Sequence, residues 1–256
     1  MGVERIINCE KINLGRNVLL KVETSEGKFI IKSYDEFPKQ EVELLNFLKI
    51  IKVPKLIDWN DNKLIYKYIE GEHKTRITNN ELKDIAKEIA RLHKQTKNKK
   101  LKEYNYLKEA KKIKIKNPIK KEILKRLKKY SFSINLPKGI VHGDIRAQNL
   151  LFYKNKFNGI IDFDKIKYTN LIYDLADLVF YWSFFPKQNK ENIRLIIDAY
   201  ESIRELTKNE KKYLFNVMIL NALMVSLEDL KELEKIKSEK LPKILKTIER
   251  LEFLIK

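Results

Sequence analysis

The first seventy residues alternate between apolar and polar positions over short stretches, a pattern typical of β-strands. A turn is indicated at residues 25–27, and apolar residues at helical spacing predict a helix over 38–52. The predicted strands cover residues 6–14, 18–24, 28–32, 55–59 and 63–69. The pattern therefore predicts a five-stranded sheet with one helix, which ends at Glu70 and Gly71.

After Gly71 the apolar residues take up helical spacing. A helix is predicted to start at a cap formed by Asn79 or Asn80 and to run to about His93. Four more helical segments are predicted beyond residue 170, the last over Leu241 to Ile255. The chain is thus expected to be α+β, with a first part over residues 1–70 and a second over 71–256.

The charge of the chain is strongly basic, with 54 Lys and Arg against 35 Asp and Glu and a formal net charge of +19. Such a charge suggests an anionic partner, which composition leaves open between nucleic acid, a membrane surface and a phosphorylated small molecule. Residues 94–129 hold sixteen Lys or Arg against three Glu, with few aromatic residues between them. This favours one or two amphipathic helices with a solvated basic face over a nucleic-acid surface.

Cysteine usage and the N-terminal residues bear on the compartment. Cys9 is the single cysteine, so it has no disulfide partner within the chain, and we expect it to pack near the first strand. The first residues lack the apolar run of a signal peptide, and no apolar stretch is long enough to span a bilayer. We therefore expect a cytoplasmic protein without a zinc site, in which His73 and His93 are ordinary surface or packing residues.

One segment concentrates residues that suit chemistry. The apolar residues Ile140 and Val141 lead into His142, Gly143 and Asp144, and Asn149 follows five residues after that aspartate. A hairpin turn over 155–158 then joins two apolar strands, the second of which ends at Asp162. Phosphoryl transfer needs a carboxylate that orients the attacking hydroxyl, and oxygen ligands for the metal that bridges the phosphates. Asp144, Asn149 and Asp162 are of the right types, and the hairpin would bring them together.

The pattern from His142 to Asn149, followed by Ile161, Asp162, Phe163 and Asp164, resembles the aminoglycoside phosphotransferase and choline kinase family, small-molecule relatives of the protein kinases. The resemblance extends over most of the chain. Further segments similar to the family are residues 17–22, 29–32, 41–48, 64–71, 85–93 and 173–176. The glycine-rich GxGxxG of protein kinases is absent, since the predicted phosphate loop holds only Gly15, and the family commonly lacks it too.

The resemblance implies a role for each matching residue of the nucleotide site. Asn17 lies in the segment similar to the phosphate loop, and Lys32 is expected to hold the α- and β-phosphates. Glu41 is the expected ion-pair partner of Lys32, with Glu43 as the competing candidate. The hinge, at about residues 66–71, is expected to place Tyr66, Lys67, Tyr68 and Ile69 against the adenine.

In the catalytic motif, the resemblance makes Asp144 the catalytic base or the group that orients the acceptor hydroxyl. Asn149 and Asp162 are the implied Mg²⁺ ligands. Three residues are expected to support them: His142 holds the loop backbone, Asp164 assists the metal or bonds to the following loop, and Asp174 ties the next helix to the catalytic loop. Arg146 either reaches a phosphate or faces solvent.

The implied fold is a two-lobed, protein-kinase-like α+β fold, with a small N-terminal five-stranded antiparallel sheet plus one helix and a larger, mainly helical C-terminal lobe. The implied activity is ATP- and Mg²⁺-dependent phosphorylation of a hydroxyl on a small molecule, such as an amino alcohol, a sugar, an aminoglycoside-like compound or an amino acid. An atypical protein kinase, a catalytically weak nucleotide-binding regulator and a basic nucleic-acid-binding protein remain alternatives. Aromatic residues at 168, 173 and 180–182 indicate a helical core more strongly than a cage for a choline-like ammonium.

Overall fold

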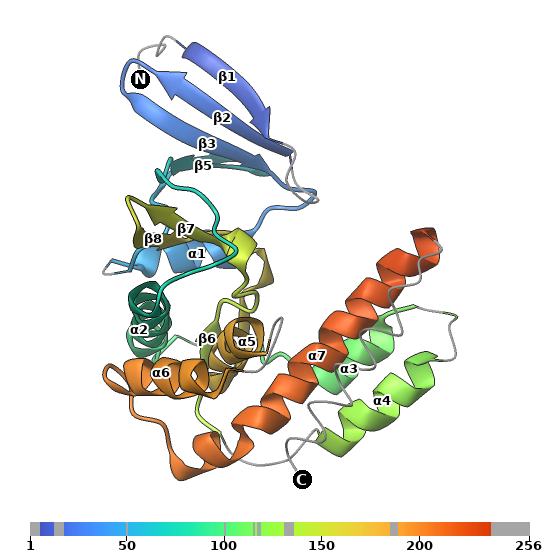
Figure 1. Cartoon of the computed structure of the whole chain (residues 1–256). Coiled ribbons are helices and arrows are strands. Elements are labelled where there is room, and N and C mark those ends of the chain that lie inside the picture. Colours follow the sequence, from blue (N-terminus) through green and yellow to red (C-terminus); the bar gives the residue numbers. More distant parts are fainter. Residues whose placement is uncertain are drawn as a thin grey trace.

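A five-stranded antiparallel sheet forms the N-terminal part of the computed structural model (Figure 1), which describes residues 6–236 except 13–17, 50, 100, 115, 117–118, 131–135 and 185–188. The strand order is β1-β2-β3-β5-β4. The strands are β1 (Ile6–Ile12), β2 (Val18–Thr24), β3 (Gly27–Ser33), β4 (Leu56–Asn60) and β5 (Lys63–Lys67). All five predicted strands are thus confirmed, with small differences at their described ends.

The single helix of this part, α1 (Lys39–Phe47), is shorter than the predicted 38–52. Leu48 already has an extended backbone, with φ −74° and ψ 119°, yet its side chain is buried. The apolar spacing beyond Phe47 therefore comes from a chain that has left the helix and still packs on the core. Pro54 disfavours the helical conformation at Val53, so the helix has no favourable continuation beyond the predicted end.

The first strand lies at the edge of the sheet and is largely exposed to solvent. Cys9 is on this strand and is itself exposed, so the expectation that it packs near the first strand was wrong. The physical reason is that β1 is the edge strand of the sheet, pairs there with β2 and is exposed over most of its length. Its thiol has no disulfide partner in the chain, since Cys9 is the only cysteine.

The C-terminal part is mainly helical, and two short sheets carry its loops. The helices are α2 (Asn79–Gln95), α3 (Tyr106–Lys112), α4 (Ile119–Tyr130), α5 (Ile172–Ser183), α6 (Lys190–Glu201) and α7 (Lys208–Ile236). Strand β6 (Lys138–Val141) pairs with β9 (Lys167–Asn170), and β7 (Leu150–Tyr153) pairs with β8 (Lys156–Ile160). Together with the sheet, this confirms the predicted α+β architecture, in which a five-stranded antiparallel sheet with one helix precedes a mainly helical part.

The basic stretch forms the two helices α3 and α4, in agreement with the prediction of one or two helices there. Three of the helical segments predicted beyond residue 170 are α5, α6 and α7, while the last, Leu241 to Ile255, lies outside the described residues. Within the described chain, no helix has the length and apolar character needed to cross a membrane.

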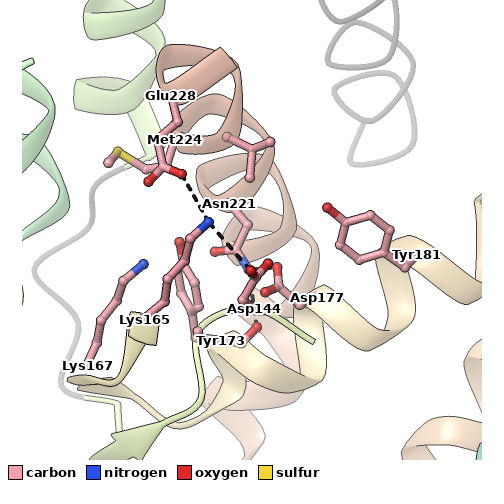
Figure 2. A pocket seen from close by; sticks show the side chains of 11 residues that line it. Asp144, Lys165, Lys167, Tyr173, Asp177, Tyr181, Asn221, Met224 and Glu228 are labelled. Carbon is pink, nitrogen blue, oxygen red and sulfur yellow. Dashed lines mark hydrogen bonds and ion pairs between the residues drawn. The ribbon is translucent and has the colours of Figure 1, made fainter. Parts of the chain in front are cut away.

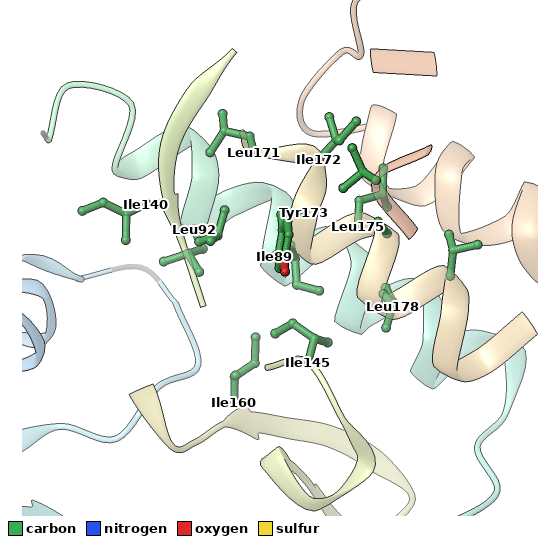
Figure 3. Packing of buried hydrophobic residues seen from close by; sticks show 14 of the residues in the cluster. Ile89, Leu92, Ile140, Ile145, Ile160, Leu171, Ile172, Tyr173, Leu175 and Leu178 are labelled. Atoms are coloured by element: carbon green, nitrogen blue, oxygen red, sulfur yellow. The ribbon is translucent and has the colours of Figure 1, made fainter. Parts of the chain in front are cut away.

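The buried core of the C-terminal part surrounds the loop that carries the motif. Figure 3 shows Ile89 and Leu92 of α2 beside Leu175 and Leu178 of α5, with Ile145 from the loop among them. Ile145 is fully buried although both of its neighbours in sequence are charged. Burial of one apolar side chain within the loop fixes the directions of the polar side chains on either side of it.

The N-terminus of α2 is capped by Thr78, so the expected cap at Asn79 or Asn80 was wrong. The Thr78 hydroxyl accepts a hydrogen bond from the Glu81 amide, and the Glu81 carboxylate accepts one from the Thr78 amide. This capping box satisfies two amides that the first helical turn leaves unpaired. It also explains why Glu81 is buried, and the ammonium group of Lys74 pairs with that carboxylate.

We expect Thr78→Ala to lower the free energy of unfolding by about 1 kcal/mol, because the N-cap acceptor is lost. Asn80→Ala is the matched control: Asn80 is exposed and has no capping bond, so its effect should stay within about 0.5 kcal/mol. Urea unfolding monitored by circular dichroism measures both. Equal losses in the two variants would contradict the cap assignment.

Candidate active site

The residues of the motif lie on a loop between two short sheets. The loop runs from His142, after β6, to a short 3₁₀ turn (Ala147–Asn149) before β7. The backbone carbonyl of Asn149 accepts a hydrogen bond of 2.9 Å from the amide of Ile161, just beyond β8. The hairpin of β7 and β8 therefore places Asn149 beside Asp162, as the sequence predicted.

A buried carboxylate holds the start of this loop. Asp174, on α5, accepts hydrogen bonds of 2.8 Å from the backbone amides of both His142 and Gly143. His93 of α2 lies 3.1 Å from the same carboxylate through Nε2, and its Nδ1 lies 2.7 Å from the hydroxyl of Tyr200. Burial alone would raise the pKa of Asp174, but the hydrogen bond and charge of His93 outweigh it and the pKa is lowered.

Gly143 is required by the backbone at this point. Its φ is +80°, and a β-carbon there would approach the carbonyl oxygen of Lys165 to 2.4 Å. Only glycine takes this conformation without strain and leaves room for that carbonyl. The close contact brings the segment after Asp162 against the loop of Asp144.

Two side chains fix the loop, His142 by contacts with the segment after β8 and Asn149 by a bond within the loop. His142 is fully buried, its Nε2 donates to the carbonyl of Ile161, and its ring lies against Phe163. The side-chain amide of Asn149 donates to the backbone carbonyl of Asp144 over 2.9 Å. A backbone carbonyl can only accept, so this bond also fixes the Asn149 side-chain oxygen as the group that is available to a cation.

The side chain of Lys32, on β3, contacts the segment that holds Asp162 and Asp164. Its ammonium lies 2.7 Å from Oδ1 of Asp162 and also contacts Asp164, although Lys32 itself is buried. Burial lowers the pKa of Lys32, but the two carboxylates more than compensate and the pKa is raised. Burial likewise acts to raise the pKa of Asp162, and Lys32 reverses this, so the pKa of Asp162 is lowered.

Glu41 does not pair with Lys32 as expected, and neither does Glu43, which is exposed and faces Lys39. The Glu41 carboxylate instead accepts hydrogen bonds from Tyr34, at 2.8 Å, and from Tyr66, at 2.7 Å. Burial raises the pKa of Glu41. The two tyrosines therefore satisfy the buried Glu41 carboxylate, while Lys32 pairs with the two aspartates.

The residues of the expected hinge divide between two tasks. The side chain of Tyr66 is buried on Glu41, whereas the backbone amides of Lys67 and Tyr68 donate to Lys55 and Lys28, respectively. The side chain of Ile69 lies next to Gly159 of β8. Asn17 lies outside the described residues, so its place relative to these groups stays a prediction.

Asp144 opens into a pocket that sequence reasoning missed, here named the Asp144 pocket (Figure 2). Arg146 binds Asp144 through both Nε and Nη2, with a distance of 2.6 Å for Nη2 to Oδ2, an ion pair that was neither of its two expected roles. Lys165 lies 3.6 Å from Asp144 and 3.3 Å from Glu228. The pocket is lined by Gly143, Asp144, Lys165, Lys167, Tyr173, Asp177, Tyr181, Asn221, Met224, Val225 and Glu228.

The floor of the Asp144 pocket holds a second buried carboxylate. Asp177 is one helical turn beyond Asp174 on α5, and the amide of Asn221 on α7 donates to it over 2.5 Å. Burial, with a smaller contribution from the charge of Asp174, raises the pKa of Asp177 to about 7. The spacing of three residues from Asp174 was the one sequence signal that could have indicated Asp177.

Most of the chain matches one known protein family. The model of the phosphotransferase enzyme family matches residues 14–206, about three quarters of the chain. The chain belongs to the phosphotransferase enzyme family. The match includes β2, β3, α1, residues 66–71, the loop of Asp144 and α5, which are the elements that carry the candidate site.

Individual known proteins match this chain over a short segment or at low sequence identity. A homoserine kinase of Bradyrhizobium diazoefficiens is 35% identical over 79 residues, which are 30% of this chain and 24% of that protein. The matched segment therefore spans about a quarter of the length of that curated relative. An amicoumacin kinase solved with AMP-PNP and Ca²⁺ has a TM-score of 0.74 at 16% identity, covering 94% of this chain and 88% of that one.

A choline kinase from Streptococcus pneumoniae gives a TM-score of 0.72 at 18% identity, covering 96% of this chain and 94% of that one. At such identities the two solved structures show the fold alone. The fold they show is the two-lobed one that the resemblance implied.

The Asp174 contacts lead to a stability prediction. Asp174→Asn should lower the free energy of unfolding by about 2–4 kcal/mol at neutral pH, because the amide nitrogen cannot accept the bonds that the carboxylate accepts. Folding lowers the pKa of Asp174, so its stabilisation is present above the unfolded pKa of about 3.9 and is lost as pH falls through the folded value. The difference between variant and parent should therefore shrink toward pH ~3.

Urea unfolding at several pH values measures this difference. Asp198→Asn on α6 is the control, since that side chain is 65% exposed and its contact with Arg194 is 3.6 Å. The control should change stability by less than about 0.5 kcal/mol. A variant as stable as the parent at neutral pH would show that Asp174 does not hold the loop.

Proposed function

We propose that this protein transfers the γ-phosphoryl group of ATP to a hydroxyl of a small molecule, with Mg²⁺ as the metal. The observation that carries the proposal is the convergence of Lys32, Asn149, Asp162 and Asp164 next to the loop of Asp144. These groups come from three separate stretches of the chain. Phosphoryl transfer needs such a set, because its catalysis consists almost entirely of positioning and charge stabilisation.

The donor set fits a hard cation. Asn149 offers a side-chain oxygen, and Asp162 and Asp164 offer carboxylates, which are the ligand types that Mg²⁺ takes alongside water and substrate phosphates. In the part of the chain that the structure describes, no three His, Cys, Asp or Glu side chains form a metal cluster by themselves. This suits a metal that is held by one or two carboxylates and by the nucleotide. When bound, Mg²⁺ would neutralise charge on the phosphate oxygens.

Lys32 is proposed to bind the nucleotide phosphates. Its ammonium is held near the end of β3, it keeps its charge, and it lies beside the proposed metal ligands. Glu41 supports it from a distance: it contributes negative charge near Lys32 without an ion pair. The N-terminal part, residues 1–70, would then be the nucleotide lobe, with the hinge at about 66–71 and the acceptor lobe over 71–256.

Asp144 is proposed to accept the hydrogen bond of the attacking hydroxyl and to receive its proton as the bond to phosphorus forms. Arg146 holds the Asp144 carboxylate through two of its nitrogens, so the carboxylate is fixed in direction. Lys165 adds positive charge on the same side. His142, Asn149 and Asp174 position the loop and so act through Asp144.

The Asp144 pocket favours a small acceptor over a protein substrate. Helices α5 and α7 contribute seven of its lining residues, including Asp177, Asn221 and Glu228, and they stand directly next to Asp144. A peptide substrate would need an open surface beside Asp144 rather than a pocket lined by two helices. The amicoumacin kinase and the choline kinase are named for different small acceptors, so they support the small-molecule class without choosing the compound.

The two aspartates can be separated by experiment. Asp144→Asn should leave Mg²⁺–ATP binding close to that of the parent and lower turnover by about 10²–10⁴-fold, the usual contribution of a positioned base. Asp162→Asn should weaken Mg²⁺-dependent ATP binding itself, and added Mg²⁺ should restore part of the activity. Calorimetry with and without Mg²⁺ measures binding, and ADP release measures turnover.

Asp84→Asn serves as the control, since Asp84 is exposed on α2 and makes none of the contacts described for the loop. It should bind Mg²⁺–ATP and turn over like the parent. The proposed roles are wrong if Asp144→Asn abolishes Mg²⁺–ATP binding while Asp162→Asn binds normally. Absence of nucleotide binding by the parent protein would overturn the proposed function as a whole.

A further inference from the structure

The charged groups of the Asp144 pocket nearly balance, although the chain as a whole is strongly basic. The lining includes the carboxylates of Asp144, Asp177 and Glu228 and the ammonium groups of Lys165 and Lys167. Arg146 neutralises Asp144 from outside the lining. A polycationic acceptor would need a clear excess of carboxylates, and a polyanionic one a clear excess of cations, so neither matches this pocket.

Lys167 stands out among these charges. Its Nζ lies over three tyrosine rings, 4.6 Å from the centre of Tyr104, 5.4 Å from that of Tyr173 and 6.0 Å from that of Tyr106. Among the described residues, none gives this ammonium an ion pair or a hydrogen bond. Burial lowers the pKa of Lys167, and the charges of Glu228 and Asp177 oppose that shift. A cation held by ring faces retains its hydrogen-bond donors for an anion.

The same tyrosines bear on the choline-like alternative. Tyr173 was one of the aromatic residues considered for a cage around a quaternary ammonium, and it stacks on Tyr106 with ring centres 4.7 Å apart. The faces of this cluster are already in contact with the ammonium of Lys167. A second cation at that position would meet the charge of Lys167. The cluster therefore presents a positive charge to the pocket.

The opposite polarity is found at Asp177 and Asn221. Asn221 donates its amide to Asp177 and to the backbone carbonyl of Tyr173, which leaves its buried side-chain oxygen without a hydrogen-bond partner in the described structure. A carboxylate and an unpaired amide oxygen together suit a donor with several N–H groups. A buried polar atom without a partner is costly, so a ligand that supplied one would gain binding energy there.

We propose that the Asp144 pocket takes a hydroxy-amino acid, whose carboxylate binds Lys167 and whose ammonium binds Asp177 and Asn221. The proposal rests on the proposed function, because it names the acceptor class of the same site. The hydroxyl of this acceptor would face Asp144. Lys167 is then the residue that selects a zwitterion over an amino alcohol.

A matched set of acceptors tests the class. ADP formation is measured with L-homoserine, with 3-aminopropan-1-ol, which lacks the carboxylate, and with 4-hydroxybutyrate, which lacks the ammonium. L-serine paired with ethanolamine extends the test to a shorter chain. We expect kcat/KM for the better amino acid to exceed that of either truncated partner by about 10- to 100-fold, the effect of one charge-assisted contact.

Variants of Lys167 test the residue. Lys167→Met keeps the packing on the tyrosines, so it should raise KM for the amino acid by about 10- to 100-fold and leave the amino alcohol within about twofold. Lys167→Arg should retain the preference for the amino acid. Lys208→Met is the control, since Lys208 is exposed at the start of α7, and it should behave like the parent.

The outcomes separate the inference from the proposed function. Equal kcat/KM for amino acid and amino alcohol, or an equal loss for both in Lys167→Met, would overturn the inference and leave the kinase intact. Mg²⁺–ATP binding by calorimetry without ADP formation from any of these acceptors would also overturn it. Failure to bind Mg²⁺–ATP would instead overturn the proposed function.

Discussion

The buried carboxylate of Asp174 is the interaction on which the site depends. A charge buried to this degree is stable only when its hydrogen bonds are satisfied, and two backbone amides and His93 do so. Those amides belong to consecutive residues, so the bonds fix the backbone direction immediately before Asp144. His93 comes from α2 and bonds in turn to Tyr200 on α6, which joins three helices to one point of the loop.

The rest of the loop follows from this anchor. Gly143 turns the chain where a side chain would strike Lys165, Ile145 inserts into the core, and Arg146 returns to hold Asp144. Asn149 then closes the loop on the carbonyl of Asp144. Each contact is local, and each constrains a different direction. Asp144 is therefore presented to the pocket by a rigid surround rather than by its own side-chain preferences.

Local chemistry explains what the sequence predicted well and what it did not. The loop of Asp144, the hairpin and the strands are formed by residues close together in the chain, so local sequence patterns predicted them. The partners of Lys32 were not predicted, because Asp162 and Asp164 are 130 and 132 residues away. The resemblance paired Glu41 with Lys32, whereas the Glu41 carboxylate accepts hydrogen bonds from Tyr34 and Tyr66. Tyr34 lies just beyond β3, and its ring centre is 5.0 Å from the Lys32 ammonium.

The charge balance of the Asp144 pocket could not be predicted from the sequence either. The net charge of +19 describes the surface as a whole and suggested an anionic partner. At the pocket, carboxylates and cations from the loop after Asp162, α5 and α7 nearly cancel, and only the folded chain brings them together. A global excess of lysine therefore says little about the ligand. In the proposed pocket, single charges would discriminate between ligands: Lys167 over tyrosine rings, and Asp177 beside an amide oxygen that has no partner among the described residues.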